Sequence, residues 1–326
     1  MRKKIAAVIP CYRVKDHVLQ VISQIGPEVD RIFVVDDCCP DDTGTIVELH
    51  CNDPRIKVIR HKTNLGVGGA VLSGYSEAIK ENCEIIVKID GDGQMDPRLL
   101  PRFVYPIIKG QADYTKGNRF YNLTQIKQMP LLRIIGNITL SFMSKLSTGY
   151  WKNFDPTNGY TAIDARVAKI LSFNSISKGY FFETDMLFRL NILRAVVLDI
   201  PMDANYKEEK SNLLIKKIFG EFLYKHTKNF FKRIFYSYFL RDMSLASLEL
   251  LAGTILLTFG MLFGFHQWHL AIAEVRLTPL GTIFLAALPV ILGIQFLLAF
   301  FAYDIIASPV TPIGDLLDTP SILFDE

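Results

Sequence analysis

The chain has 326 residues, 50% of them hydrophobic, and a formal net charge of only +3. A chain of this length holds one large domain or a domain with an appendage, and its apolar share is high for a wholly soluble protein. The small net charge excludes a protein that binds nucleic acid through a uniformly basic surface. Lysine and arginine are nevertheless dense between Lys210 and Arg241, and neither occurs after Arg276.

The N-terminal stretch MRKKIAAVIPCYRV predicts a first strand, because its apolar run before Pro10 is too short for the core of a signal peptide. The cysteines are odd in number, lie in the first quarter of the chain and lack zinc-ribbon spacing: Cys11, Cys38, Cys39, Cys51 and Cys83. This pattern favours reduced thiols in a cytosolic compartment.

The first half alternates short apolar runs with longer helical stretches. The expected strands are 5–10, 32–37, 56–59 and 85–90, and the expected helices are 14–25, 43–51 and 67–81. Nearly continuous apolar strands separated by helices indicate an α/β sandwich with a mainly parallel sheet covered on both faces. Further elements are expected to about residue 208, in ADYTKGNRF, a helix at 131–147, FFETDMLFRLNIL and AVVLDIP.

The character of the sequence changes after about residue 210. Residues 211–241 mix aromatic and aliphatic side chains with lysine and arginine at helical spacing, which predicts basic amphipathic helices at a membrane interface. The apolar runs 244–265 and 280–303 are each about one bilayer long, so we expect a two-helix transmembrane hairpin over 242–304. The alternative is a pair of buried helices in a soluble domain.

The basic segment before the first span also predicts the orientation, because cytoplasmic flanks of membrane spans are enriched in lysine and arginine. The N-terminal domain should then be cytoplasmic, and the loop 266–279 should face the other side of the membrane. The acidic tail 305–326 should return to the cytoplasm.

Polar groups follow three of the predicted strands, in the segments 10–12, 36–37 and 90–94. In an open α/β sheet, ligands bind beyond the carboxyl ends of the strands. The carboxylates of Asp90 and Asp92 and the amide oxygen of Gln94 are the donors that Mg²⁺ or Mn²⁺ prefers when it also binds substrate phosphates. The alternative is a solvated turn in which Asp96 caps the next helix.

A set of segments in this order resembles a family-2 glycosyltransferase with the GT-A fold: VIPCYR, VVDDCCPDDT, NLGVGGA, IDGDGQMDP, GNRF, DPTNGYTAID and FFETDMLFRL. More narrowly, the set is similar to the polyprenyl-phosphate glycosyltransferases of the dolichyl-phosphate mannose synthase type. The resemblance implies an α/β fold with a GT-A (Rossmann-like) nucleotide-sugar-binding domain over 1–210, followed by amphipathic juxtamembrane helices and two transmembrane helices. The Gln-x-x-Arg-Trp motif of processive polysaccharide synthases is absent.

The resemblance also implies roles for single residues. Nucleotide binding falls to Pro10, Tyr12, Asp36, Asp37, Asn64, Gly66 and Asp90, with Leu65 in the same loop. The implied ligands of Mg²⁺ or Mn²⁺ are Asp90, Asp92 and Gln94, and the implied ligands of the acceptor phosphate are Arg119 and Arg133. The implied catalytic set is Asp92, Arg119, Arg133 and Asp155. The usual PxYNE start is PCYRV here, so both UDP and GDP donors stay open, with UDP favoured.

Other polar residues keep two interpretations each. Asp155, in FDPTNGY, is either a turn residue or a contact of the donor sugar. Glu183 and Asp185 are either first-turn acids of a helix or contacts of the donor or acceptor. The segment YKEEKSNL resembles a family loop that closes near the donor, or is a solvated charge run; its candidate phosphate contacts are Lys207, Lys210 and Ser211.

The resemblance implies an inverting, metal-dependent hexosyltransferase that moves a sugar from a nucleotide-sugar to polyprenyl phosphate (undecaprenyl or dolichyl phosphate) for cell-envelope glycan assembly. An acceptor phosphate is largely a dianion at neutral pH and needs little help from a general base. One alternative is a GT-A transferase with another lipid acceptor, diacylglycerol or a lipid-linked glycan, which should need a base carboxylate. The other is a catalytically dead membrane scaffold. The expected partners are both substrates and the lipid bilayer but no nucleic acid, and homo-oligomers stay open.

Overall fold

The computed structural model describes residues 2–121, 131–203 and 215–318, without the side chains of 131–133 and 215–219. Two compact units make up the chain. Residues 1–230 and 309–326 form the first unit, and Phe231–Ser308 forms the second. The division falls inside the basic segment expected at 211–241, and the described residues 309–318 belong to the first unit.

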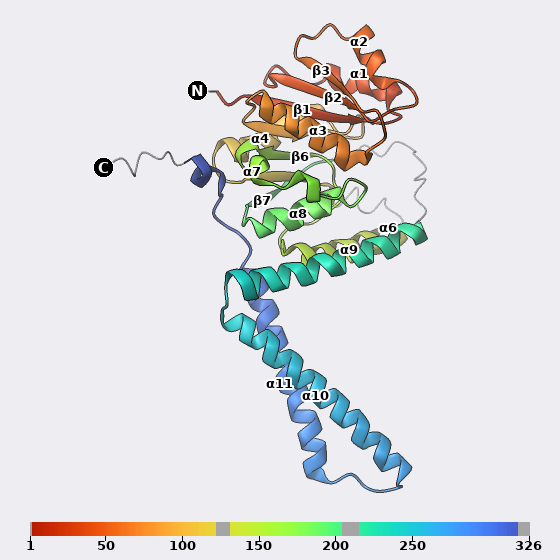
Figure 1. Cartoon of the computed structure of the whole chain (residues 1–326), viewed down its shortest axis with the longest axis vertical. Helices are drawn as coiled ribbons and strands as arrows, with labels where there is room; N and C mark the ends of the chain where they lie inside the picture. Colours follow the sequence, from red (N-terminus) through yellow and green to blue (C-terminus); the bar gives the residue numbers. More distant parts are fainter. Residues whose placement is uncertain (1, 122–130, 204–214, 319–326) are drawn as a thin grey trace, which may run out of the picture. The chain divides into compact units, whose positions relative to one another are not determined.

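The first unit is built on a seven-stranded sheet in the order β3-β2-β1-β4-β6-β5-β7 (Figure 1). The strands are β1 (Ile5–Cys11), β2 (Arg31–Asp36), β3 (Ile56–Arg60), β4 (Ile85–Lys88), β5 (Tyr114–Asn118), β6 (Thr161–Asp164) and β7 (Val197–Pro201). The strands expected in the first half are confirmed. Strand β6 is not predicted by the sequence, and it pairs antiparallel with both β4 and β5, whereas the other pairs are parallel.

Helices cover both faces of this sheet, as the apolar strands predict. They are α1 (Lys15–Ser23), α2 (Thr43–His50), α3 (Gly66–Lys80), α4 (Leu100–Ile108), α6 (Leu131–Thr148), α7 (Ala165–Ile170) and α8 (Phe182–Ile192). Alternate residues of a strand point to opposite faces. Accordingly, Ala6 and Val8 of β1 belong to the core formed with α3, α7 and α8, whereas Ala7 and Ile9 belong to the core formed with α1, α2 and α4.

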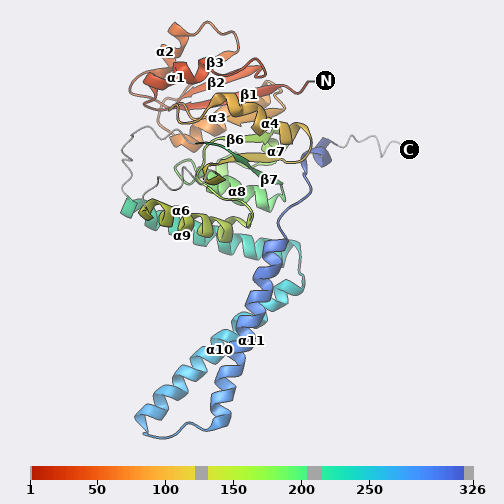
Figure 2. The same cartoon turned by 180° about the vertical axis from the view of Figure 1, so that it is seen from behind.

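Helix α9 (Ile215–Phe235) carries the basic amphipathic segment, and most of it belongs to the first unit. It lies beside α6 in both views (Figures 1 and 2). His226 is 3% exposed, and its Nδ1 lies 2.8 Å from the hydroxyl of Ser147 on α6. Asn229 donates a hydrogen bond of 3.1 Å to Asp185 on α8. One face of this helix is therefore buried in protein.

The last described residues, 309–318, pack back onto the first unit. Asp113, which precedes β5, accepts hydrogen bonds from Ile313 N–H at 3.0 Å and from Gly314 N–H at 2.7 Å. Arg166 of α7 lies 2.9 Å from Asp315. Of the acidic tail expected over 305–326, residues 309–318 are therefore docked on the first unit, whereas residues 305–306 still belong to α11.

The second unit contains two long apolar helices, α10 (Leu245–Ala273) and α11 (Leu280–Ile306). Their most apolar 18-residue stretches have mean hydropathies of 1.8 and 2.5, and only 11% and 17% of these stretches are buried. A helix of this length extends about 40 Å, which exceeds the roughly 30 Å hydrocarbon core of a bilayer. Such exposed apolar helices fit membrane spans rather than the core of a soluble domain.

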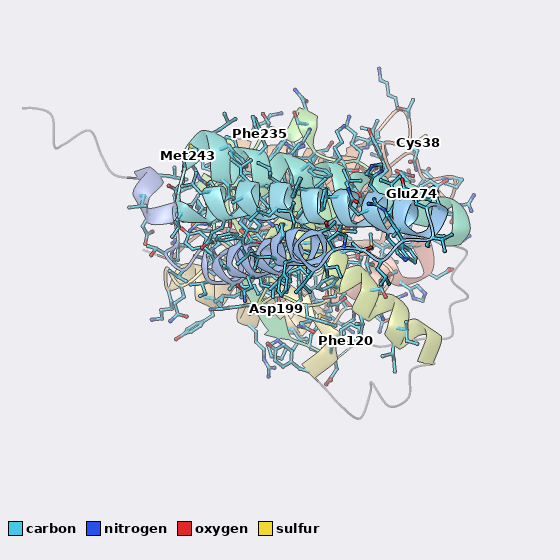
Figure 3. All side chains as sticks on the ribbon, turned by 90° about the horizontal axis from the view of Figure 1, so that it is seen from below. Cys38, Phe120, Asp199, Phe235, Met243 and Glu274 are labelled. Atoms are coloured by element: carbon cyan, nitrogen blue, oxygen red, sulfur yellow. The ribbon has the colours of Figure 1, made fainter. Side chains whose placement is uncertain are left out.

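Helix α10 is longer than the expected run 244–265. Met243 and Glu274, labelled in Figure 3, lie just outside its two ends, Leu245 and Ala273. The expectation of a loop over 266–279 is therefore wrong, because the polar stretch from His266 to His269 stays helical and only 274–279 connect the two helices.

Glycines allow α10 and α11 to pack closely. A Cβ atom at Gly260 would lie 2.8 Å from the carbonyl oxygen of Ala286, and one at Gly293 would lie 2.6 Å from the backbone nitrogen of Leu257. Both distances are too short for a side chain. Small residues at such crossings are the usual means of bringing helices together in membranes.

A buried ion pair connects the end of α9 to α11 within the second unit. Arg233 Nη1 lies 2.6 Å from Asp304 Oδ1, and both side chains are 2% exposed. Tyr238, in the π-helical turn Tyr236–Arg241, donates to the same carboxylate at 2.6 Å. The basic segment expected at 211–241 thus forms one continuous helix, α9, followed by the π-helical turn. Arg233 and Tyr238 hold the end of this segment against α11.

Candidate active site

One edge of the sheet gathers the predicted site segments. Strands β1, β2, β4 and β5 all end at this edge, and the antiparallel strand β6 begins there. The segments that follow Cys11, Asp36, Lys88 and Asn118 therefore meet the segment that precedes Thr161. This is the position at which open α/β sheets bind ligands.

Tyr12 and Pro10 lie at the end of β1, as expected for a base pocket. Pro10 is a buried residue within the strand, whereas the ring of Tyr12 is 44% exposed just beyond it. The guanidinium of Arg13 lies 5.4 Å from the centre of this ring. The exposed aromatic face suits stacking on a nucleotide base, and this role stays a prediction.

Asp36 holds the loop that follows β2. Its side chain is buried and accepts hydrogen bonds from Cys39 N–H at 2.8 Å and Gly44 N–H at 2.6 Å. Both carboxylate oxygens therefore have backbone partners. The expected contact with base or ribose stays a prediction, to which the structure adds a clear role in shaping this loop.

Asp37 holds the second loop, before α3. Its carboxylate accepts from Leu65 N–H and Gly66 N–H, both at 2.8 Å, and lies 2.6 Å from His61 Nδ1. Gly66 has a φ of +81°, a conformation that favours glycine, and its N–H also donates to Asn64 Oδ1 at 3.0 Å. The loop that should lie near the nucleotide is therefore fixed by a buried acid on the neighbouring strand.

A buried lysine lies beneath the acidic turn. Lys88, the last residue of β4, is 1% exposed, and its Nζ lies 2.7 Å from Asp90 Oδ1 and 3.2 Å from Glu183 Oε1. It also donates to the carbonyl oxygen of Gly159 at 3.0 Å. Burial lowers the pKa of Lys88, but the charges of Asp90 and Glu183 outweigh this effect and hold it well above its usual value. The pKa of Glu183 is raised, mainly by burial.

The turn after β4 offers oxygen donors suited to a hard divalent cation. Gln94 N–H donates to Asp92 Oδ1 at 2.9 Å, and Gly93 adopts a φ of +73°, so the chain doubles back between the two side chains. No cluster of three His, Cys, Asp or Glu side chains suited to a metal occurs within the described ranges. Two carboxylates and an amide fit a cation that takes its other ligands from substrate phosphates. Asp96 accepts from Arg98 N–H and caps the next turn, as the alternative interpretation expects.

Arg119 and Asp155 form a two-pronged ion pair beyond the end of β5. Arg119 Nε and Nη2 lie 2.7 and 2.6 Å from the two carboxylate oxygens of Asp155. The Asp155 side chain is 2% exposed and that of Arg119 is 22% exposed. Burial raises the pKa of Asp155, but the hydrogen bonds and charge of Arg119 outweigh this effect and lower it. The Asp155 carboxylate is thus buried against Arg119 and fixes the position of its guanidinium, and little of it is exposed to contact a sugar.

Two further expectations concern α8 and the undescribed segments. Asp185 accepts from Ser177 N–H at 2.8 Å, from Arg189 Nε at 3.2 Å and from Asn229, so it ties α8 to its neighbours and does not join Glu183 at the acidic turn. The remaining candidates lie outside the described residues or side chains: Arg133, Lys207, Lys210 and Ser211.

Residues 6–171 match the family described as Glycosyl transferase family 2. The chain belongs to this family. Among similar proteins, the UDP-N-acetylglucosamine–dolichyl-phosphate N-acetylglucosaminyltransferase of Methanococcus voltae is 30% identical over 63% of this chain and 87% of its own length. The undecaprenyl-phosphate mannosyltransferase of Micrococcus luteus is 27% identical over 67% of this chain and 90% of its own. These relatives are polyprenyl-phosphate sugar transferases.

Solved structures confirm the GT-A-like fold. Glucosyl-3-phosphoglycerate synthase from Mycobacterium tuberculosis, in complex with Mn²⁺, UDP-glucose and phosphoglyceric acid, has a TM-score of 0.53 and is 17% identical. The match covers 71% of this chain and 79% of that structure. The α/β fold of GT-A type predicted from the motifs, followed by a helical region with two apolar helices, is therefore confirmed.

The motifs missed Lys88, although a signal for it was present. A lysine in the otherwise apolar strand IIVK predicts a buried charge that needs partners, because the strand is covered on both faces. Its partner Glu183 lies 95 positions along the chain, a separation that sequence spacing does not bridge.

Proposed function

We propose that this glycosyltransferase moves a sugar from a UDP-sugar to the phosphate of a polyprenyl phosphate, with inversion and with the help of a divalent cation. Family membership supports sugar transfer, and the similar proteins named above act on dolichyl or undecaprenyl phosphate according to their names. UDP is preferred to GDP because the relative with 30% identity is named for a UDP-sugar.

The observation that carries the proposal is the pairing of Arg119 with Asp155. A hydroxyl acceptor would need an available base, but Asp155 is buried against a guanidinium that lowers its pKa, and Asp185 is tied to α8 and α9. A phosphate acceptor needs a cation instead. A guanidinium is well suited to this task, because its planar N–H donors bind phosphate oxygens as well as carboxylates in a bidentate manner.

The donor side is assigned to the turn after β4. Asp90, Asp92 and Gln94 would hold the cation, which supplies charge neutralisation on the departing diphosphate when bound. Tyr12 would stack on the base, and the loops held by Asp36 and Asp37 would bind base and ribose. Arg119, with Arg133, would keep the attacking phosphate close to the donor, so the protein's main contribution is to hold two anions together.

The apolar helices support a membrane hairpin. The chain enters them from the first unit and returns to that unit, where Asp113 holds the backbone of Ile313 and Gly314. The catalytic unit and the tail must then lie on the same side of the membrane, as two crossings require. The basic residues before α10 favour the cytoplasmic side. We also propose that the product, a dolichyl- or undecaprenyl-linked sugar, is used in the assembly of cell-envelope glycans.

The test uses the purified full-length protein in detergent with Mg²⁺ or Mn²⁺, undecaprenyl phosphate and a panel of UDP- and GDP-sugars. A lipid product with a single phosphate, seen by mass spectrometry and abolished by Asp92→Ala or by EDTA, would support the proposal and identify the sugar. Hydrolysis of a nucleotide-sugar without lipid product would shift the assignment to another lipid acceptor. Absence of both turnover and nucleotide binding would indicate a scaffold.

A further inference from the structure

Lys88 occupies a position where a charge is expensive. The other residues of β4 are aliphatic and buried, and Lys88 itself is 1% exposed. Moving an ammonium out of water costs several kcal/mol, and apolar residues of similar volume in place of a buried ion pair often give equal or greater stability. The lysine therefore supplies something other than stability.

The contacts of Lys88 fix its ammonium in one place. Its Nζ donates to Glu183 Oε1 on α8 and to the carbonyl oxygen of Gly159 before β6, and it forms an ion pair of 2.7 Å with Asp90 Oδ1 in the turn after β4. Two hydrogen bonds and an ion pair from three separate segments leave the ammonium little freedom to move. The lysine thus sets the side-chain orientation of Asp90, which is itself 26% exposed at the ligand-binding edge.

Gly159 provides the space that this arrangement needs. A Cβ atom at this position would overlap both Asp90 Oδ2 and Lys88 Nζ. Because the segment before β6 lies directly against the ion pair, any side chain here would separate the two groups. Glycine is therefore required by close approach rather than by a turn.

We propose that Lys88 is a positioning residue for the donor nucleotide. It holds the Asp90 carboxylate in the orientation that meets the donor, Glu183 holds the lysine from α8, and Gly159 leaves room for the pair. This inference rests on the proposed function, because it gives Asp90 a donor to meet. Partners that orient a metal ligand typically change metal affinity or activity about 10- to 100-fold when they are mutated, and Asp90 is a proposed metal ligand.

The decisive measurement is UDP binding by isothermal titration calorimetry, on the full-length protein in detergent with and without Mn²⁺. Lys88→Met should weaken UDP binding about 10- to 100-fold and raise KM for the nucleotide-sugar, while KM for the lipid phosphate stays unchanged. Gly159→Ala should give a loss of UDP affinity in the same direction with both charges still present. The matched control is Lys116→Met, because Lys116 is an equally buried lysine that pairs with Asp199 on β7 instead.

The double variant Lys88→Met/Glu183→Gln separates positioning from charge burial. It removes the lysine together with the negative charge that the lysine neutralises, so its thermal midpoint should recover relative to Lys88→Met while UDP affinity stays low. Recovery of UDP affinity in the double variant, or unchanged affinity in both Lys88→Met and Gly159→Ala, would overturn the inference. If the unaltered protein binds no nucleotide, the proposed function itself fails. The unaltered protein alone gives this result, so it is distinguishable from a failure of the inference, which appears only in the variants.

Discussion

Replacement of Arg119 by alanine tests the acceptor side of the site. The change removes the guanidinium that should hold the lipid phosphate and leaves Asp155 without its main cation. A hydrogen bond between charged groups contributes about 1.5–3 kcal/mol. Its loss in the transition state should lower kcat/KM for polyprenyl phosphate by about 10- to 150-fold, while the affinity for UDP stays within about twofold of the original.

The same variant has a cost in stability that follows from burial. Asp155 is 2% exposed, so without Arg119 it becomes a buried, uncompensated charge, and removal of one partner from such a pair costs about 3–5 kcal/mol. Arg119 is 22% exposed and can be hydrated, so we expect a value near the lower end, and a smaller loss for Asp155→Asn. Because the pKa of Asp155 is lowered in the folded state, the pair stabilises the protein above the unfolded pKa of about 4 and loses this effect as the pH falls further.

The assay combines lipid-phosphate kinetics, UDP titration and urea unfolding for three variants. Arg119→Lys keeps the charge but loses the planar fork, so it should retain UDP binding and show an intermediate defect with the lipid. Asp155→Asn should impair lipid kinetics through Arg119 with less loss of stability than Arg119→Ala. Lost UDP binding with normal lipid kinetics in Arg119→Ala would refute the assignment of Arg119 to the acceptor.

Three further predictions concern packing away from the site. Burial lowers the pKa of His226 to about 4, below the ordinary value of 6.5, so only the unfolded chain binds this proton as the pH falls between the two values. Acidification over this range should destabilise the first unit by up to about 3 kcal/mol, and His226→Gln should remove that dependence from urea unfolding curves. Asp113→Ala should release residues 309–318 to limited proteolysis, whereas Asp315→Ala should not, because the Asp315 side chain is 72% exposed in its ion pair; equal cleavage of both variants would contradict the docking. Gly260→Leu should lower the thermal midpoint in detergent by forcing α10 from α11, and Gly281→Leu, whose Cβ would meet no atom within 4 Å, should leave it unchanged.

Much of the fold could be predicted because its signals are local. The apolar runs that became β1 to β4, and the helical stretches between them, are continuous segments whose pattern reflects burial on both faces. Strand β6 escaped prediction because its four residues, TAID, form no continuous apolar run such as the one in β4, and its antiparallel direction depends on partners far away in the chain. The end of α10 was misplaced because the polar residues from His266 to His269 look like a loop, although nothing in them breaks a helix.

The candidate site was predictable in its location but not in its pairings. Asp90 and Asp92 could be placed at one edge because they follow a predicted strand, whereas Arg119 was found only through the family resemblance. The partner of Arg119 lies 36 positions away, and the partner of Lys88 on α8 lies 95 positions away. No periodic pattern links such residues. The sequence therefore indicates Asp155 and Glu183 as candidate site acids, but it does not predict that they hold Arg119 and Lys88 in place.

These pairings change the roles assigned to the candidate carboxylates of the site. Among the carboxylates predicted to contact substrate, Asp90, Asp155, Glu183 and Asp185 lie outside the loops held by Asp36 and Asp37. In the structure each of these four carboxylates lies against a cation or an amide donor of the protein. Asp155 holds Arg119, and Glu183 holds Lys88. Both cations lie beside the predicted substrate contacts. Acids that fix cations suit an enzyme whose two substrates are both anions. A transferase that had to deprotonate a hydroxyl would instead need one of these acids open to its acceptor.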